Sequence, residues 1–416
     1  MSAPRARRSE LRAWRCRALL AGAIGLLAGA SCGSGSGGGS TSTTGGGSGT
    51  TPPATINNIQ PIQVTIGPAG NDVNELLTSV TICEPQTSTC QTISNILVDT
   101  GSTGLRIVAP VVTLSLPRAT DTSGNPIGNC IAFASDTYAW GPVATADVQL
   151  AGEVASSVPI QLIGAPSFPD APADCQTGGS EVNAAVLGAN GILGVGVFQQ
   201  DCGSACTGST GPAIYFGCPS SGCVAEAVSL QQQVQNPVGL FPQDNNGLII
   251  TLPALDPGGN QSVSGSLTFG IGTQSNNALS AVQIYTTDSN GNFSVTFNGQ
   301  TYSESFLDSG SNGIFFLDSG SLGIPACSND TSFYCPSTTV AYSAITTGLN
   351  GATNTIAFDI ANADTLFSTG NTAFNDLGGP NVGGFDLGLP FFFGRNVYLA
   401  IQGASTSGGT GPYWAF

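Results

Sequence analysis

Histidine and lysine are both absent from the 416 residues of this chain. The lack of histidine excludes Ser-His and Cys-His catalytic pairs and imidazole metal ligands, and the lack of lysine excludes Schiff-base chemistry and the lysine of a phosphate-binding loop. The acid–base chemistry that remains is mostly that of carboxylates. We therefore expect a site built from acidic side chains, without a metal ion or a cofactor.

Positive charge is also scarce. Six of the nine basic residues lie in the first 17 positions, so from Cys32 onward only Arg106, Arg118 and Arg395 face 24 acidic side chains. Nucleic acids and anionic lipids bind proteins largely through lysine and arginine, so neither is expected as a partner. The acidity favours solubility, and it raises the hypothesis of acid tolerance, because few ion pairs are lost when carboxylates become protonated.

The N-terminus reads as an export signal. An arginine-rich stretch leads into the apolar residues 18–30, which are too few for an ordinary transmembrane helix, so we take residues 1–31 as a signal peptide. The end of this segment resembles a bacterial lipoprotein signal, which implies a lipidated Cys32 in the periplasm or on the outer membrane, with contact to the membrane only through the lipid anchor. Simple secretion is the alternative, since Gly29 stands where leucine is usual. Residues 32–52 form a Gly/Ser-rich tether.

Cysteine usage agrees with export. Without Cys16 and Cys32, ten of the 12 cysteines remain, an even number that allows five disulfides in an oxidising compartment. Four of them form a cluster that can pair in a nested or a sequential way, and its irregular spacing disfavours zinc. The candidate disulfides are Cys83–Cys90, Cys130–Cys175, Cys327–Cys335 and, for the nested pairing, Cys202–Cys223 and Cys206–Cys218.

The body of the chain, from residue 53 to residue 416, has the texture of a β protein and is long enough for two lobes. Short Val/Ile/Thr/Phe runs alternate with Gly, Asn, Asp and Pro. Asn298-Gly299 between alternating flanks predicts a hairpin. One helical segment is expected at residues 225–234. The sequence thus predicts an all-β class with minor helix, and its clearest strand segments are 54–66, 143–163, 248–252 and 293–306.

Two distant segments repeat one pattern around an aspartate. Asp99 and Asp308 each end an apolar run and are followed by Thr/Ser-Gly-Ser. Each copy also has an apolar-Gly segment downstream, at residues 190–196 and 384–389. The chain therefore describes two copies of one β unit, each of which supplies one carboxylate.

A pair of such carboxylates has defined chemistry. Two carboxylates about 3 Å apart cannot both ionise, so they share one proton and offer an acid beside a base. The base activates a water molecule and the acid protonates a carbonyl oxygen. Gly101 and Gly310 allow the backbone to approach the carboxylates closely, and their amides can donate to them.

The order of these motifs resembles that of the bilobal, pepsin-like aspartic peptidases, and also an uncharacterised family of bacterial exported proteins with the same motif pair. The likeness extends over nearly the whole body, including residues 243–248 and 265–269, where the peptidase family turns from one lobe to the other. It implies two β-barrel lobes, at residues 53–268 and 269–416, with a cleft between them. It further implies an aspartic endopeptidase that acts on a peptide or protein substrate.

The resemblance also implies roles for the neighbours of the catalytic pair, Asp99 and Asp308. Ser102 and Ser311 each bond the outer oxygen of an aspartate, while Thr100 and Ser309 form reciprocal bonds to the opposite loop. A flap hairpin over the cleft falls near Tyr138 and Trp140, which contact substrate in this interpretation; packing in the core is the other fate of such aromatics.

Three features qualify this interpretation. Leu317-Asp318-Ser319-Gly320-Ser321 repeats the second motif, but Leu322 stands where a small polar residue belongs, so we assign Asp308 to the site and Asp318 to a turn or helix cap. Asp386 stands at an apolar position of the second apolar-Gly segment, and no lysine-rich pro-segment exists. Two alternatives stay open: a non-catalytic bilobal surface lipoprotein that binds a peptide, glycan or protein partner in the cleft, and two β-sandwich modules with coincidental Asp-Ser-Gly turns.

Overall fold

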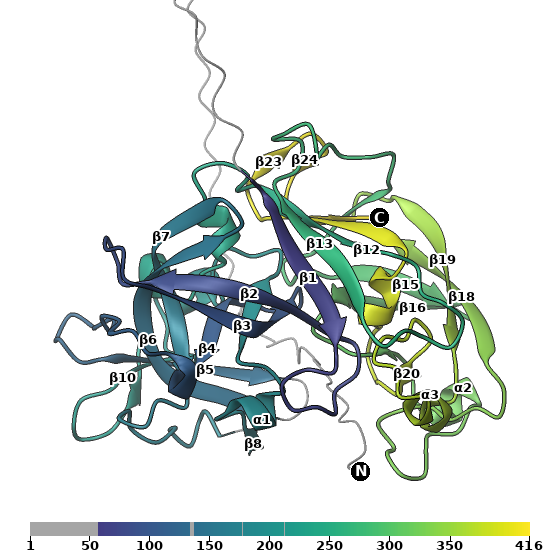
Figure 1. Ribbon diagram of the computed structural model, residues 1–416, viewed down its shortest axis with the longest axis horizontal. Coiled ribbons are helices and arrows are strands. Elements are labelled where there is room, and N and C mark those ends of the chain that lie inside the picture. The colour runs from purple at the N-terminus through teal and green to yellow at the C-terminus, as the bar shows by residue number, and fades with distance from the viewer. Residues whose placement is uncertain (1–56, 134–136, 177, 212) are drawn as a thin grey trace, which may run out of the picture.

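The computed structural model describes residues 57–133, 137–176, 178–211 and 213–416 (Figure 1). The predicted signal peptide, Cys32 and the tether lie outside these residues. Strands dominate the described chain and helices are short, so the all-β class with minor helix is confirmed. None of the helices within the described ranges is long and apolar enough to cross a bilayer.

A sixteen-stranded sheet holds most of the first half of the chain and reaches into the second. Its longest members, β6 and β7, form a hairpin over residues 137–163, in the region where the sequence predicts strands. The strands up to residue 225 are β1 (Ile59–Thr65), β2 (Glu75–Cys83), β3 (Cys90–Asp99), β4 (Thr103–Val108), β5 (Ile127–Phe133), β6 (Thr137–Leu150), β7 (Glu153–Ile163), β8 (Gly179–Ser180), β9 (Gly191–Val195), β10 (Tyr215–Gly217) and β11 (Val224–Ala225).

The second half contributes a seven-stranded sheet and several strands of the larger one. Asn298-Gly299 joins β15 to β16 as predicted, and both residues have positive φ, as the two-residue hairpin turn requires. The strands are β12 (Gly247–Leu252), β13 (Val263–Phe269), β14 (Ile284–Thr286), β15 (Phe293–Phe297), β16 (Gln300–Asp308), β17 (Ile314–Phe315), β18 (Val340–Thr347), β19 (Thr353–Ile360), β20 (Gly378–Gly379), β21 (Asp386–Gly388), β22 (Arg395–Ala400), β23 (Ser405–Thr406), β24 (Gly409–Thr410) and β25 (Tyr413–Ala415).

In the part of the chain that the structure describes, helical structure is limited to single turns and short helices. At residues 225–234 the expected helix is wrong: β11 and the 3-10 turn η3 occupy the segment, because Ser229 and Gln232 cap that turn and the chain then extends toward Pro237. The helices are α1 (Ala184–Leu187), α2 (Ser319–Leu322) and α3 (Ala363–Ser368), with 3-10 turns η1 (Ala109–Val111), η2 (Gly203–Cys206), η3 (Leu230–Gln232), η4 (Pro237–Leu240) and η5 (Leu389–Phe392).

Strands from both ends of the chain meet in the middle of the large sheet. β12 and β13 pair with each other, β13 pairs with β1 near the N-terminus, and β12 pairs with β22 near the C-terminus. Figure 1 shows β1 and β13, with β12 beside them, where a purple-to-teal half meets a green-to-yellow half. The predicted lobe boundary at residues 268 and 269 falls at the end of β13, inside this shared part of the sheet.

The described chain contains five disulfides. Cys83–Cys90, Cys130–Cys175 and Cys327–Cys335 pair as predicted. The nested pairing Cys202–Cys223 and Cys206–Cys218 is wrong, because the cluster pairs sequentially as Cys202–Cys206 and Cys218–Cys223. Cys202 and Cys206 lie at the two ends of η2, and Cys218 and Cys223 enclose a tight turn, so each pair closes locally.

Candidate active site

The two repeated motifs occupy equivalent places in the fold. β3 ends on Asp99 and pairs in parallel with β9, with Asp99 opposite Gly194. β16 ends on Asp308 and pairs in parallel with β21, with Asp308 opposite Gly388. Each apolar-Gly segment therefore lies beside the strand that delivers the aspartate.

Each carboxylate is fixed by the loop that follows it. The Gly101 amide donates to Asp99 Oδ1 and the Gly310 amide donates to Asp308 Oδ1, each at 2.8 Å. Both aspartates are buried, with 5% of Asp99 and none of Asp308 exposed. Amide donors hold the two side chains in single orientations at the strand ends.

The two carboxyl groups lie close together, each against the opposite loop. A Cβ atom on Gly101 would lie 2.6 Å from Asp308 Cγ, and a Cβ atom on Gly310 would lie 2.7 Å from Asp99 Oδ1. Only glycine leaves room at these two positions, which explains their place in both motifs.

Reciprocal hydrogen bonds lock the two loops together. Thr100 Oγ1 donates to the Leu307 carbonyl at 3.1 Å and accepts from the Ser309 amide at 2.9 Å. Ser309 Oγ donates to the Val98 carbonyl at 2.7 Å and accepts from the Thr100 amide at 3.1 Å. Four bonds between buried groups thus fix the spacing of the two aspartates.

The serines of the two motifs have different partners. Ser102 Oγ donates to Asp99 Oδ2 at 2.5 Å. Ser311 Oγ lies 3.2 Å from Asp308 Oδ2 but only 2.6 Å from Asp386 Oδ2. Asp386, which is 1% exposed, is therefore a third buried carboxyl group beside the pair.

Burial raises the pKa of Asp308 well above its usual value, and the neighbouring Asp99 and Asp386 carboxylates raise it further. The Gly310 amide acts in the opposite direction, as a smaller effect. A carboxyl group with a raised pKa beside a second carboxylate can keep a proton where an ordinary aspartate has lost it. The arrangement can therefore offer an acid and a base to one bound molecule.

Asp318 lies apart from the pair. It is exposed and caps α2, where its side chain accepts from the amide and the hydroxyl of Ser321 at 2.9 and 2.6 Å. These hydrogen bonds lower the pKa of Asp318. The structure thus gives Asp318 a helix cap and gives Asp308 the position beside Asp99.

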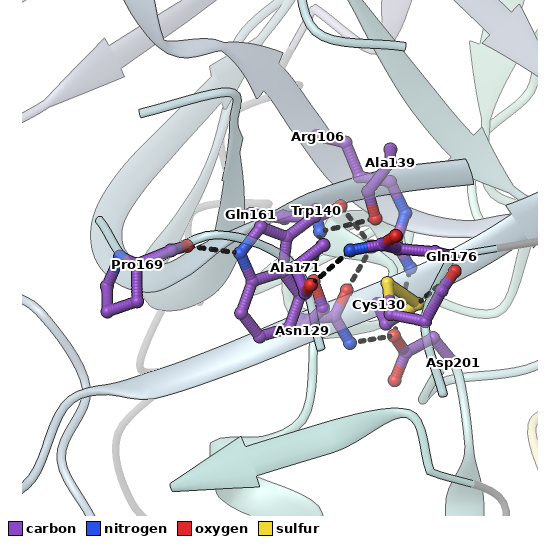
Figure 2. The surroundings of a disulfide bond; sticks show 11 residues. Arg106, Asn129, Cys130, Ala139, Trp140, Gln161, Pro169, Ala171, Gln176 and Asp201 are labelled. Carbon is purple, nitrogen blue, oxygen red and sulfur yellow. Dashed lines mark hydrogen bonds and ion pairs between the residues drawn. A yellow bond between two sulfur atoms is a disulfide. The ribbon is translucent and has the colours of Figure 1, made fainter. Parts of the chain in front are cut away.

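The predicted substrate-contacting aromatics lie on the hairpin of β5 and β6, whose connecting residues 134–136 are outside the described residues. Trp140 does not project from this hairpin: it is 7% exposed, and its indole donates to the Pro169 carbonyl at 2.8 Å (Figure 2). It packs edge-on against Phe216 beside the Cys130–Cys175 disulfide. The expected substrate contact of Trp140 is therefore replaced by core packing, and Tyr138, half-buried, packs against the same cluster.

Sequence reasoning missed a buried ion pair behind the first motif. Arg106 on β4 is fully buried and pairs with Asp201 at 2.9 Å (Figure 2). Its guanidinium also donates to Asn129 Oδ1 and Gln161 Oε1, at 2.5 and 2.7 Å. The available signal was an arginine between the apolar residues Leu105 and Ile107.

Potential metal ligands gather at one place in the described ranges, Cys327, Cys335 and Asp364. The two sulfurs there are joined in a disulfide and are not free to bind a metal ion. The expected absence of a metal and of a cofactor stays a prediction.

The architecture is similar to that of a known enzyme. The crystal structure of aspartic proteinase from Irpex lacteus matches 86% of this chain and 96% of its own, with 15% identity and a TM-score of 0.51. At this identity the likeness shows the fold, which is of the pepsin-like bilobal class. Comparison with curated proteins finds no match.

A family model extends over almost the whole body of the chain. It is described as "Protein of unknown function (DUF3443)" and matches residues 54–416. The match includes both motifs, both apolar-Gly segments and all five disulfides. The chain therefore belongs to the DUF3443 family.

Proposed function

We propose that the protein is an aspartic endopeptidase in which Asp99 and Asp308 share one proton and activate water on a peptide bond. The observation that carries this proposal is the reciprocal bonding of the two loops, which holds the two buried carboxyl groups together. A paired carboxyl site of this kind gives both proton transfers of amide hydrolysis without a metal or cofactor.

The chemistry proceeds in two steps. The ionised carboxylate takes a proton from water as the oxygen attacks the substrate carbonyl carbon, and the protonated carboxyl group gives its proton to the carbonyl oxygen. The tetrahedral intermediate then collapses with cleavage of the C–N bond, and a proton passes to the leaving amine. The pair acts as a unit in this scheme, so neither aspartate is assigned a separate role.

Two properties of the chain fit such an enzyme. Four of the five disulfides in the described residues lie within the predicted first lobe, residues 53–268, which contains Asp99. Disulfides of this kind are typical of an oxidising compartment. The resemblance of residues 1–32 to a lipoprotein signal supports export, with attachment to the membrane through Cys32. The substrate is then a peptide or protein outside the cytoplasm.

A peptide-library digest from pH 3 to 7 tests the proposal. Wild type should cleave, a statine-type inhibitor should block cleavage, and Asp99→Asn or Asp308→Asn should each reduce it by at least about 1,000-fold. Asp318→Asn, in the repeated motif, is the matched control and should retain wild-type rates. A folded wild type without cleavage at any pH would contradict the proposal and favour the alternative, a surface protein that binds a peptide, glycan or partner protein.

A further inference from the structure

We propose that Asp386 is a positioning residue of the carboxyl pair, which acts through Ser311 and through its own charge to keep the shared proton on the pair up to a higher pH. This inference rests on the proposed function for its kinetic consequence. Its physical content, the coupling of a third carboxyl group to Asp308, can be measured without any substrate.

The hydroxyl of Ser311 lies between two carboxyl groups, those of Asp308 and Asp386. A serine has one proton to donate, and its Oγ lies closer to Asp386 than to Asp308, at 2.6 against 3.2 Å. Asp99 has the undivided donor Ser102 at 2.5 Å. Because a hydrogen bond stabilises the ionised form of a carboxylate, Asp308 is the less stabilised of the two anions.

The charge of Asp386 acts on Asp308 as well. Asp386 is 1% exposed, so water screens its interaction with Asp308 poorly. A negative charge on Asp386 opposes a second negative charge on Asp308, and this repulsion contributes to the raised pKa of Asp308. The division of the Ser311 proton between two acceptors and the negative charge of Asp386 both disfavour the ionised form of Asp308.

The described elements packed against Asp386 carry few charged side chains. Asp386 pairs with Phe306 on β16 and with Phe315 on β17. Glu304 on β16 is exposed. Neither β17 nor the 3-10 turn η5 carries a charged residue, and Arg395 on β22 lies over the Phe391 ring, with its Nη1 donating to the Phe391 carbonyl.

The first lobe has an apolar residue at the position that is equivalent to Asp386. Counting from the glycine opposite each aspartate, Asp386 corresponds to Ile192, which is buried and apolar. Leu97 lies opposite Ile192 where Phe306 lies opposite Asp386. The third carboxyl group is thus confined to the half of the site that contains Asp308.

Asp386→Asn tests the proposal, because it removes the charge while an amide oxygen can still accept from Ser311. The alkaline limb of the kcat/KM–pH profile should move to lower pH by about one unit, while KM changes less than twofold. Asp376→Asn is the matched control: this half-buried carboxyl group of the same lobe has a pKa raised mainly by burial, and its charged neighbour is Asp359. It should leave the limb in place.

Carbon-13 NMR of aspartate-labelled protein separates this proposal from the proposed function. The Asp308 titration, assigned with Asp308→Asn, should move to lower pH in Asp386→Asn and stay unchanged in Asp376→Asn. Asp386→Ile, the residue type of the first lobe, should give the same direction if Asp386→Asn does not fold. A shifted titration without hydrolysis supports the coupling and contradicts only the peptidase; an unmoved titration or an unmoved alkaline limb overturns the inference.

Discussion

The two half-sites, one around Asp99 and one around Asp308, have the same strand arrangement. They differ in the buried side chains that pack against these strands. β3, β4 and β9 in the first lobe repeat in β16, β17 and β21 in the second, down to the glycine opposite each aspartate. One cross-strand pair departs: Arg106 lies opposite Ile192, whereas Phe315 lies opposite Asp386. Each lobe thus carries one buried ionisable residue at this pair, a base in the first and an acid in the second.

The difference shows how a duplicated frame supports unequal carboxyl groups. Arg106 forms an ion pair with Asp201 and donates to the side-chain oxygens of Asn129 and Gln161, so its positive charge is compensated within the first lobe. Asp386 instead reaches the site through Ser311. The loops that carry the two aspartates are alike. The difference between the two half-sites comes from the buried residues Arg106 and Asp386.

The largest effect is expected from breaking the ion pair of the first lobe. Arg106→Met leaves Asp201 buried without its cation, and loss of one partner of a buried pair costs about 3–5 kcal/mol of unfolding free energy. Urea unfolding measures this loss. Arg118→Met, at an exposed arginine that bonds Ser167, is the control and should cost less than about 0.5 kcal/mol. A loss as small as the control's would contradict the role given to Arg106.

Gly101→Ala and Gly310→Ala probe the shared part of the two half-sites. Each new methyl group would lie within 2.7 Å of the opposite carboxyl group, so the pair must separate and kcat/KM should fall by about 100-fold or more. Gly320→Ala in the repeated motif would meet only its neighbour Asp318, at 3.1 Å, and is the control. Equal rates in all three variants would show that the pair is not the site of reaction.

The reciprocal hydrogen bonds of Thr100 and of Ser309 should contribute equally to the free energy of unfolding. Thr100→Val and Ser309→Ala each remove two buried hydrogen bonds, so each should lower the free energy of unfolding by about 1–3 kcal/mol. Chemical denaturation of the two variants, side by side, measures the symmetry. A loss of stability in one variant but not in the other would contradict the equivalence of the two loops.

The smallest effect concerns the pH dependence of stability and separates the true second motif from its copy. Because the folded pKa of Asp308 is raised, the unfolded state ionises first, and stability is lost as pH rises through the folded value. The Tm of Asp308→Asn should therefore exceed that of wild type by more at pH 7 than at pH 4. Asp318 has a lowered pKa and stabilises only above its unfolded value, so Asp318→Asn should lower Tm slightly at pH 7. Calorimetry that finds the same sign for both would contradict this assignment.

The sequence was informative where the structure depends on local pattern. Asp99 and Asp308 end apolar strands and precede Gly-containing turns, and both features are visible in a few consecutive residues. The hairpin at Asn298-Gly299 follows for the same reason. Fold class and the members of the pair were therefore predictable.

Features that depend on distant partners were not predictable. Trp140 turns inward because the Pro169 carbonyl, on a loop 29 residues away, accepts its indole proton. The disulfide cluster pairs sequentially because η2 brings Cys202 to Cys206, and spacing alone allowed either arrangement. Asp386 was visible as an acid at an apolar position, but its contact with Ser311 needs the register of β21 against β16.

The central claim is that the two half-sites hold one proton between them, and carbon-13 NMR titration of the wild-type protein tests it most directly. With Asp99→Asn and Asp308→Asn to assign the signals, the account predicts two separated titration steps for the pair, the upper one well above the usual aspartate value of about 3.9. Two independent, coincident titrations near that value would contradict it.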